Sequence, residues 1–259
     1  MDASAVATRL SDIIATSPGQ VSVAVRSGEG FRFDSDADRV VSAASTIKVP
    51  ILLAYLASGL PLDLPVSLPD ARVGGCGPLS LLPSVTSLPG AEALRLMIAL
   101  SDNDATNALI GLVGVGEVMR LLGRAGTRHT ALRRRMMDSA AAAAGLENET
   151  CAADMADLLV AVREGRLLAP RETATALAIM REQQFDEGLP AYLPADVRCA
   201  SKTGSLDGVR HDIALLERGD AWVAVAALGT DFMDGTIDRG TSVYPTYAVI
   251  GEAVATLLP

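Results

Sequence analysis

The order of hydrophobic patterns along the chain restricts its fold more than any other feature. Apolar residues alternate with other residues, as in strands, near residues 21–25 and again in three short segments after Pro194. Between about 88 and 190 the spacing is helical, and it is interrupted by Gly, Pro or polar residues. Strands at the two ends of a chain are most simply joined in one sheet, with the helices between them as an inserted lobe.

The pattern also predicts individual elements and a division into lobes. Helices are expected at residues 3–16, 45–56, 91–100, 104–113, 115–123, 150–164, 169–183 and 242–257, and strands at 21–25, 31–33, 197–203, 209–216 and 221–228. The run from Ala140 to Ala144 is expected in a loop. The fold class is therefore α/β (α+β): residues 1–60 and 195–259 form an antiparallel sheet flanked by helices, and residues 61–194 form an all-helical lobe without strands. A cleft between two such lobes is the natural place for a site.

Composition limits the class of protein and its partners. With 259 residues, 49% hydrophobic and 20% charged, the chain is long enough for one large domain or two closely packed lobes. Its net charge of −9 argues against nucleic acid or an anionic membrane as a partner, and we expect a monomer. The first residues lack the features of a secretory signal, which predicts a cytoplasmic protein, or a periplasmic or secreted one if a leader was removed. The three cysteines are far apart and have no neighbouring His, so we expect buried or half-buried fillers rather than a disulfide framework or a metal site.

Lysine is nearly absent from this chain. Only two of the 22 basic residues are lysines, Lys48 and Lys202. Arginine keeps its proton at any accessible pH, whereas a desolvated lysine can lose it. A chain that uses lysine so rarely is expected to keep it where a deprotonatable or compact ammonium is required, so these two residues indicate a site.

Ser45 and Lys48 are three residues apart, so they share one face of a helix and come within hydrogen-bond reach. The residues that follow are apolar on every face, and burial among them should lower the pKa of Lys48 because desolvation disfavours the ammonium. A neutral amine could then take the proton of the Ser45 hydroxyl, which makes the pair a nucleophile and its base. The alternative is an ordinary helix start with a lysine that extends to the surface.

Ser101-Asp102-Asn103 lies on a turn between two predicted helices. There Ser101 could relay a proton to a leaving nitrogen and the Asn103 amide could hold a substrate carbonyl, with Asp102 turned inward to hold the turn. Simple helix capping is the alternative, since all three residue types favour it.

Lys202-Thr203-Gly204 lies on the first strand after Pro194. Lys202 and Thr203 could bind a carboxylate, and Gly204 would let a substrate backbone approach. A basic residue on a strand edge is the alternative.

Ser-x-x-Lys, Ser-Asp-Asn and Lys-Thr-Gly in this order are typical of class A β-lactamases and penicillin-binding proteins. The chain resembles that superfamily over nearly its whole length, most closely at residues 45–49, 101–107 and 201–205. The resemblance implies that an acyl-enzyme forms without a metal or an organic cofactor. The roles that it implies are an acylated nucleophile at Ser45, its base at Lys48, a proton relay at Ser101, substrate contacts at Asn103, Lys202 and Thr203, and an oxyanion hole from the N–H groups of Ser45 and Ser205.

The resemblance fails at the residue that releases the acyl group. Class A β-lactamases carry a Glu-x-x-Leu-Asn loop whose Glu activates the hydrolytic water, whereas this chain has residues 132–138 at the corresponding place, without that pattern. The nearest acids are Asp138 and Glu147. Asp138 is a candidate replacement base, and a surface or capping role is its alternative. Rapid β-lactam turnover is therefore not expected.

Arg210 and His211 lie on the second strand after Pro194, close to where class A enzymes place a cation against the substrate carboxylate. Both are candidates for substrate binding, but only one of two neighbouring strand residues can face the cleft. Arg210 is favoured for its bidentate fork, and a purely structural role for both is the alternative.

Two surface features have simpler interpretations. The arginines at 120, 124, 128 and 133–135 are interpreted as a solvated face on helices, one of which holds the adjacent loop through an acid such as Glu149. The loop Gly74-Gly75-Cys76-Gly77 is expected to line the mouth of the cleft.

The sequence thus predicts a serine acyl-hydrolase for a lactam, amide or ester that carries a carboxylate. The leading variant is a class A-like hydrolase with weak or altered β-lactamase activity. A D,D-peptidase-like enzyme or an amidase or esterase for a secondary metabolite is the alternative among enzymes. A penicillin-binding sensor that stays acylated is the alternative outside them.

Overall fold

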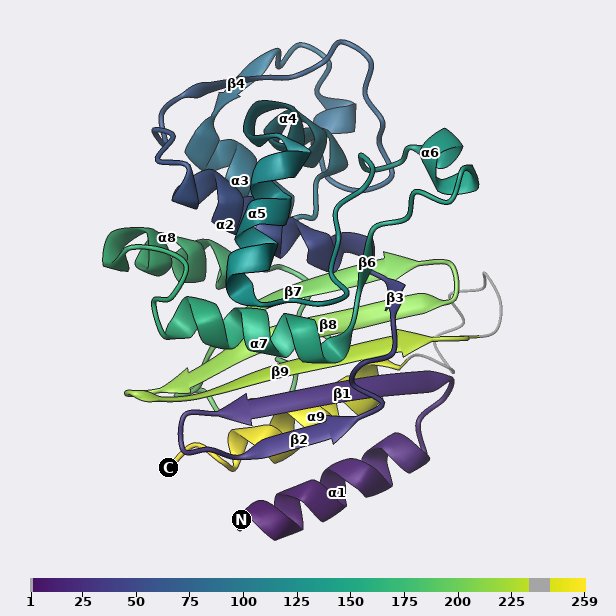
Figure 1. Ribbon diagram of the computed structural model, residues 1–259, viewed down its shortest axis with the longest axis vertical. Coiled ribbons are helices and arrows are strands. Elements are labelled where there is room, and N and C mark those ends of the chain that lie inside the picture. Colours follow the sequence, from purple (N-terminus) through teal and green to yellow (C-terminus); the bar gives the residue numbers. More distant parts are fainter. Residues whose placement is uncertain (1, 233–242) are drawn as a thin grey trace.

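A five-stranded antiparallel sheet crosses the molecule in the computed structural model, which describes residues 2–232 and 243–259 (Figure 1). Its strands, in spatial order, are β2 (Arg32–Ser35), β1 (Gln20–Ser27), β9 (Ala221–Thr230), β8 (Val209–Arg218) and β7 (Arg198–Leu206). Because β1 pairs with β9, the two ends of the chain share one sheet, as predicted from the sequence. The predicted mixed α/β class is confirmed.

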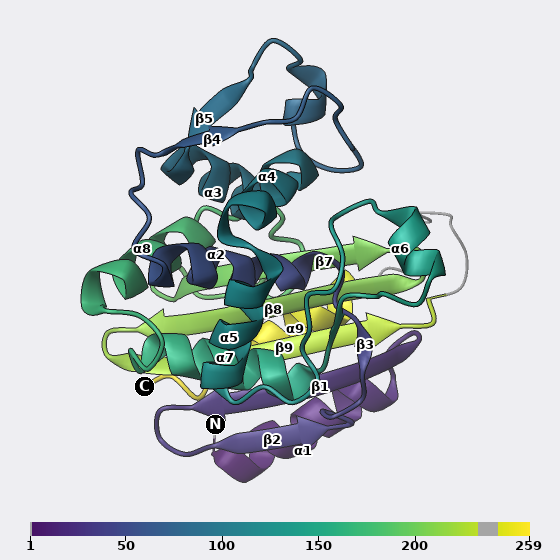
Figure 2. The ribbon, with the colours of Figure 1, turned by 45° about the horizontal axis from the view of Figure 1, so that its top comes forward.

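Helices cover both faces of this sheet (Figures 1 and 2). α1 (Ala3–Ala15) and α9 (Tyr244–Ala255) pack together over one face. On the other face α7 (Ala152–Arg163) lies against β1 and β9, and α8 (Pro170–Met180) contacts β7. Successive side chains of each strand therefore enter two different cores.

The helix that carries Lys48 is buried along almost its whole length. α2 (Lys48–Ala57) follows a 3₁₀ turn, η1 (Ala44–Ile47), and every residue from Lys48 to Leu56 is buried. Pro50 lies in the first turn of α2, where its missing N–H costs no helical hydrogen bond. The sequence predicted this burial. The helical segment begins at Ala44, close to the predicted residue 45, but its first turn is a 3₁₀ turn and α2 itself begins at Lys48.

Three further helices surround α2. They are α3 (Gly90–Ala99), α4 (Asn103–Val113) and α5 (Val115–Ala125). Among the described residues no single helix combines the length and apolar character needed to cross a membrane; α4 and α5 do so only when taken together, and they are bent by 86°.

The middle of the chain contains strands, so the prediction of a strand-free segment was wrong. β4 (Pro65–Ser67) pairs with β5 (Ser87–Pro89), and β6 (Glu149–Thr150) pairs with β3 (Val41–Ser42). Strands of two or three residues are too short for alternation to be recognised in a sequence.

The alanine run is also not a simple loop. It contains the short helix α6 (Ser139–Ala143), whose first turn is capped by the Asp138 carboxylate. Alanine has the highest helix propensity, so one turn forms once a cap is present.

One hydrophobic core joins the helices around α2 to the inner face of the sheet. α7 and α8, which the sequence assigned to the helical lobe, contribute to this core and pack on the sheet. The lobe boundaries after residues 60 and 194 stay a prediction.

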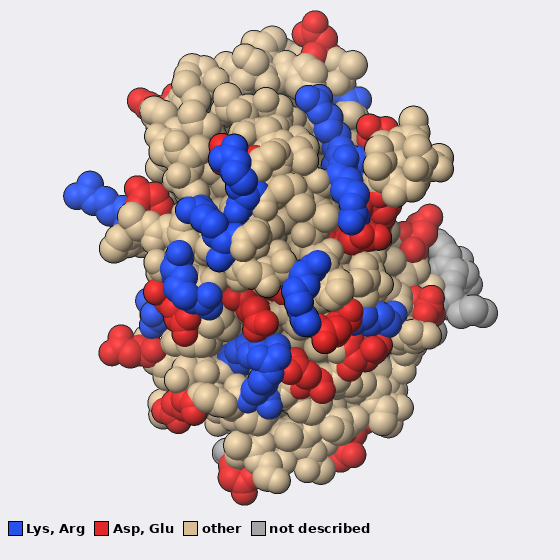
Figure 3. All heavy atoms as spheres, in the orientation of Figure 1, with Lys and Arg blue, Asp and Glu red and all other residues tan. Residues whose placement is uncertain are grey.

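The arginine group is more dispersed than predicted. Arg133, Arg134 and Arg135 lie in the loop between α5 and α6 and not on a helix. The ion pairs of the group are Arg120–Glu117, Arg128–Asp38, Arg133–Glu149 and Arg134–Glu147. The predicted contact with Glu149 is confirmed, and basic and acidic side chains lie side by side on this face (Figure 3).

Candidate active site

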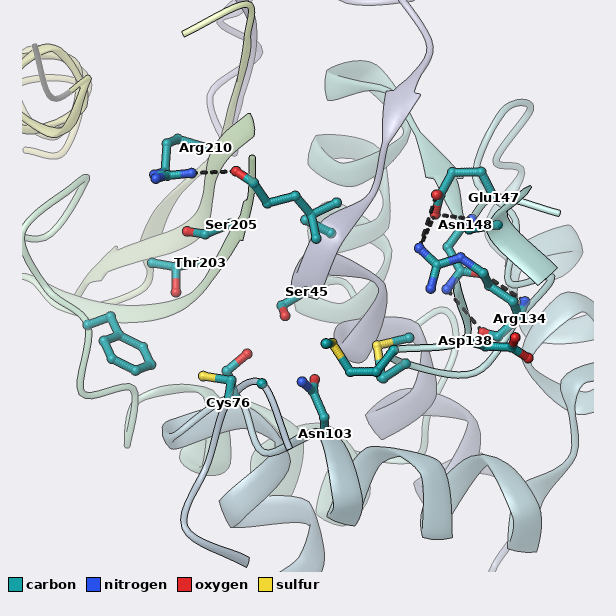
Figure 4. A pocket seen from close by; sticks show the side chains of 18 of the residues that line it. Ser45, Cys76, Asn103, Arg134, Asp138, Glu147, Asn148, Thr203, Ser205 and Arg210 are labelled. Carbon is teal, nitrogen blue, oxygen red and sulfur yellow. Dashed lines mark hydrogen bonds and ion pairs between the residues drawn. The ribbon is translucent and has the colours of Figure 1, made fainter. Parts of the chain in front are cut away.

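A pocket of about 680 Å³ opens where the helices around α2 meet one end of the sheet (Figure 4). Segments far apart in the sequence form its walls. They are the start of η1, the loop at Gly75, the turn before α4, the loop between α5 and β6, the segment at Phe185, the facing ends of β7 and β8, and Tyr244.

Ser45 and Lys48 meet beneath this pocket. Lys48 Nζ lies 3.1 Å from Ser45 Oγ, as the three-residue spacing predicted. Ser45 lines the pocket and is half-buried, whereas Lys48 is fully buried and reaches Ser45 from below. Ala44, directly before the serine, has a φ of +45°, a conformation that costs free energy for a residue with a Cβ.

The turn before α4 brings its own polar groups to the same amine. Lys48 Nζ donates to the Ser101 carbonyl at 2.6 Å and to Asn103 Oδ1 at 2.9 Å, and it lies 3.0 Å from Ser101 Oγ. Ser101 has a φ of +55°, which turns its carbonyl and its hydroxyl toward Lys48. Asp102 points inward as predicted, and accepts from the N–H groups of Ala105 and Leu79 at 2.8 and 2.9 Å.

Burial shifts the pKa of both lysines downward. Desolvation, and next the charge of Lys202, lower the pKa of Lys48 well below 10.5. Desolvation also lowers the pKa of Lys202, to about 8. The charge of Lys202 therefore disfavours an ammonium at Lys48 beneath the pocket.

The Lys-Thr-Gly segment on β7 is divided between the pocket and the interior. Thr203 and Ser205 line the pocket, whereas Lys202 is fully buried and donates to the Thr203 carbonyl at 2.9 Å. Gly204 has a packing role that the sequence did not predict, and its role toward a substrate stays a prediction. A Cβ at this position would lie 3.1 Å from Ser45 N, so the missing side chain lets β7 approach η1.

Arg210 lines the pocket and His211 does not. The Arg210 guanidinium donates to the carbonyls of Leu206 and Val209 at 2.5 and 2.7 Å, and it pairs with no carboxylate of the described residues. The alternation of strand residues explains why only one of these neighbours reaches the pocket.

The loop between α5 and β6 forms the wall opposite Arg210 (Figure 4). Met136, Met137 and Asp138 line the pocket there. Asn107 fixes this loop, because its Oδ1 accepts from Met136 N at 2.8 Å and its Nδ2 donates to Met136 O at 3.1 Å.

The acids of this loop are already engaged. Asp138 accepts from Ala141 N at 2.9 Å, and Glu147 pairs with Arg134 at 2.7 Å. Glu187, in the segment between α8 and β7, lines the pocket without a partner among the described residues. Sequence reasoning missed Met136 and Glu187 as pocket residues and Asn107 as the residue that fixes the loop. Only Asn107, within the segment 101–107, carried a signal.

The glycine-rich loop lines the pocket through Gly75 and Cys76, as predicted. Asn103 holds it, because its N–H donates to the Cys76 carbonyl at 3.1 Å and its Nδ2 donates to the Gly74 carbonyl at 2.9 Å. All three cysteines are free thiols. Among residues 2–232 and 243–259, no three His, Cys, Asp or Glu side chains come together in a way that could hold a metal ion.

Comparison with known proteins agrees with this geometry. A profile of the β-lactamase enzyme family matches residues 5–247, and a comparison with curated proteins finds no match. The fold is similar to that of a β-lactamase from Sphaerobacter thermophilus, with 29% identity over 100% of this chain and 99% of the other, and a TM-score of 0.85.

Two other solved structures are similar over nearly the whole chain. One is a variant of the last common ancestor of Gram-negative class A β-lactamases, with 25% identity over 98% of both chains and a TM-score of 0.85. The other is a mutant of PBP-A in an acyl-enzyme complex with penicillin G, with 24% identity over 98% of this chain and 96% of that one, and a TM-score of 0.84. The chain therefore belongs to the β-lactamase enzyme family and is a serine hydrolase of the β-lactamase and penicillin-binding superfamily.

Proposed function

We propose that Ser45 is acylated by a lactam, amide or ester that carries a carboxylate, and that release of the acyl group is slow. The observation that carries this proposal is the contact of 3.1 Å between Ser45 Oγ and a fully buried amine, Lys48 Nζ. A buried amine of lowered pKa is a base that can act at neutral pH.

The hydrogen-bond partners of Lys48 favour a neutral amine that accepts the proton of the Ser45 hydroxyl. A neutral amine has two N–H groups and one lone pair. The Ser101 carbonyl and Asn103 Oδ1 can only accept, so they take the two N–H groups. The lone pair is then left for a hydroxyl. Ser45 and Ser101 both line the pocket, and the half-buried Ser45 is the more exposed of the two.

The acylation step balances with these groups alone. Ser45 Oγ forms a bond to the substrate carbonyl carbon while its proton passes to Lys48 Nζ. The carbon–nitrogen or carbon–oxygen bond then breaks, and the proton moves from Lys48 through Ser101 Oγ, 3.0 Å away, to the leaving atom. The N–H groups of Ser45 and Ser205 would hold the oxyanion, as the family resemblance implies.

Arg210 supports a substrate with a carboxylate. Its guanidinium has five N–H donors, and the two carbonyls that it contacts leave donors that can face a ligand. A carboxylate there would be held by charge-assisted hydrogen bonds at the opposite side of the pocket from Asp138.

Slow release of the acyl group is expected from the residues of the loop between α5 and β6 that line the pocket. Hydrolysis of an acyl-enzyme needs a base that activates water. The described loop offers two methionines to the pocket, and the Asp138 and Glu147 carboxylates are held by a helix cap and an ion pair. A long-lived acyl-enzyme would suit a weak β-lactamase, a peptidase-like enzyme or a penicillin-binding sensor.

Intact-mass measurement together with turnover distinguishes these cases. We would incubate the protein and its Ser45→Ala variant with penicillin G and with a chromogenic cephalosporin. A lasting adduct on the unmodified protein and none on the variant supports the proposal, and the rate of adduct loss measures release. Rapid turnover without an adduct would contradict slow release, and no reaction with either lactam would leave only a hydrolase of other amides or esters.

A further inference from the structure

His211 is a fully buried titratable residue that the proposed chemistry does not use. Its ring connects three segments. Nε2 lies 2.8 Å from the Ser42 carbonyl on β3, and Nδ1 lies 3.2 Å from Gly229 N on β9 and 2.9 Å from the Arg210 carbonyl on β8. The ring therefore joins the sheet to the strand that leads into η1.

The contacts settle which nitrogen carries the proton. Each ring nitrogen faces a carbonyl, which can only accept, but Nδ1 alone also faces a donor, the Gly229 N–H. The proton of the neutral ring is therefore assigned to Nε2, which donates to the Ser42 carbonyl. Nδ1 then accepts from the Gly229 N–H, and the Arg210 carbonyl already accepts from the Tyr247 hydroxyl at 2.8 Å. Burial, the largest cause, lowers the pKa of His211 to about 4, which agrees with a neutral ring.

The peptide group that His211 contacts is held from both sides. Its carbonyl belongs to Ser42 and accepts from His211, and its N–H belongs to Ala43 and donates to the Asn148 carbonyl at 2.7 Å. Only Ala43 separates this peptide plane from Ala44, whose φ is +45°. A strained residue keeps its conformation only where the surrounding structure imposes it.

We propose that His211 is a positioning residue, which fixes the Ser42–Ala43 peptide plane and thereby holds the strained Ala44 and the hydroxyl of Ser45 in place for attack. The inference rests on the proposed function, because it assigns His211 to the reactivity of Ser45. It also explains why a histidine occupies this strand position although its side chain does not reach the pocket.

Three variants test this. His211→Leu removes all three ring contacts, and His211→Gln keeps an N–H donor that can reach the Ser42 carbonyl. Leu215→Ala is the matched control: it lies on β8 and its fully buried side chain enters the same core, so it destabilises the sheet without touching Ser42. For each we would measure the saturating rate of acylation by a chromogenic cephalosporin, the dissociation constant of the preceding complex, and amide hydrogen exchange in residues 41–47.

For His211→Leu we expect acylation on the order of 10²-fold slower, since a misplacement near 1 Å can have this effect. The dissociation constant should stay unchanged because His211 does not line the pocket, and exchange in residues 41–47 should become faster. His211→Gln should recover most of the rate, and Leu215→Ala should leave both the rate and the exchange unchanged.

Equal acylation by His211→Leu and the unmodified protein would overturn the inference and leave the proposed function intact. If the unmodified protein is not acylated at all, the proposed function fails, and the exchange data still decide whether His211 holds the segment. Faster exchange in Leu215→Ala to the same extent would show a general loss of stability and would also overturn the inference.

Discussion

Replacing Asp154 with Ala should destabilise the protein far more than the same change at Asp157 on the same helix. Asp154 is 4% exposed, and its carboxylate accepts from the N–H groups of Arg128, His129 and Thr130 at 3.0, 2.7 and 2.7 Å, and from the Thr130 hydroxyl at 2.9 Å. These residues lie near the start of the loop between α5 and β6 that carries Met136, so the carboxylate anchors one end of the pocket wall.

The size of this destabilisation follows from the hydrogen-bond donors that lose the Asp154 carboxylate as their acceptor. Thr130 is buried, so its N–H stays unpaired at a cost of about 1–3 kcal/mol. Its hydroxyl keeps only the contact of 2.9 Å with Thr150 Oγ1 and loses a hydrogen bond to a charged acceptor, which costs about 1.5–3 kcal/mol. The half-buried His129 and exposed Arg128 can turn to water. We expect a loss of roughly 3–4 kcal/mol in the free energy of unfolding, and a melting temperature lower by about 6–15 °C for a chain of this size.

Asp157 provides the matched control. Its side chain is half exposed and pairs with Arg26 at 2.8 Å, while Arg26 keeps a second partner in Asp34. Loss of such a pair should cost about 1 kcal/mol or less. Calorimetry of both variants checks the reasoning, and similar melting temperatures for the two would refute it.

The pH dependence of stability gives a second check of Asp154. Burial raises its pKa, but the hydrogen bonds from Arg128, His129 and Thr130 outweigh this, so that its pKa lies below the ordinary 3.8. The unfolded chain thus binds the proton more tightly, and the stabilisation is present above pH 3.8 and is lost as the pH falls through the lower folded value. Asp154→Ala should remove this part of the acid sensitivity.

Three further predictions concern the pocket. Met136→Glu should speed loss of the acyl group by about 10²-fold or more, because it supplies a base beside Asn107. Met136→Gln places a side chain of the same size without a base there and should not have this effect. The amount of acyl adduct, followed over time by intact mass, distinguishes the two variants. Lys48→Ala should slow acylation by about 10²–10⁴-fold. In the unmodified protein the acylation rate should rise with pH and level off well below pH 10.5, because the pKa of Lys48 is lowered. A rate that still increases at pH 10 in stopped-flow measurements would contradict this. Arg210→Ala should raise the KM of lactams that carry a carboxylate and leave their methyl esters unaffected, and an equal effect on both would argue against the proposed contact.

The sequence predicted the shared sheet and the contact between Ser45 and Lys48 because both depend on local rules. Alternation identifies strands of eight to ten residues, and a spacing of three places two side chains on one helix face. The same alternation correctly left only one of Arg210 and His211 for the pocket.

The remaining features depend on contacts between distant segments. Asn107 holds Met136 across 29 positions of the chain, and no local pattern encodes such a pair. Gly204 was expected to admit a substrate, but the position that its side chain would occupy faces η1, and the sequence does not show that these two segments meet. The strands β3 and β6 have two residues each, so only their pairing reveals them.

The complete burial of Lys48 and Lys202 has a practical consequence. Every other basic side chain is arginine or histidine, so the native fold presents no lysine amine to solvent. Lysine-specific endoproteases, and succinimidyl esters that react at lysine, would find these two side chains only after the fold opens. Their rate of reaction would therefore give a sensitive readout of how often the interior beneath the pocket becomes accessible, without any engineered label.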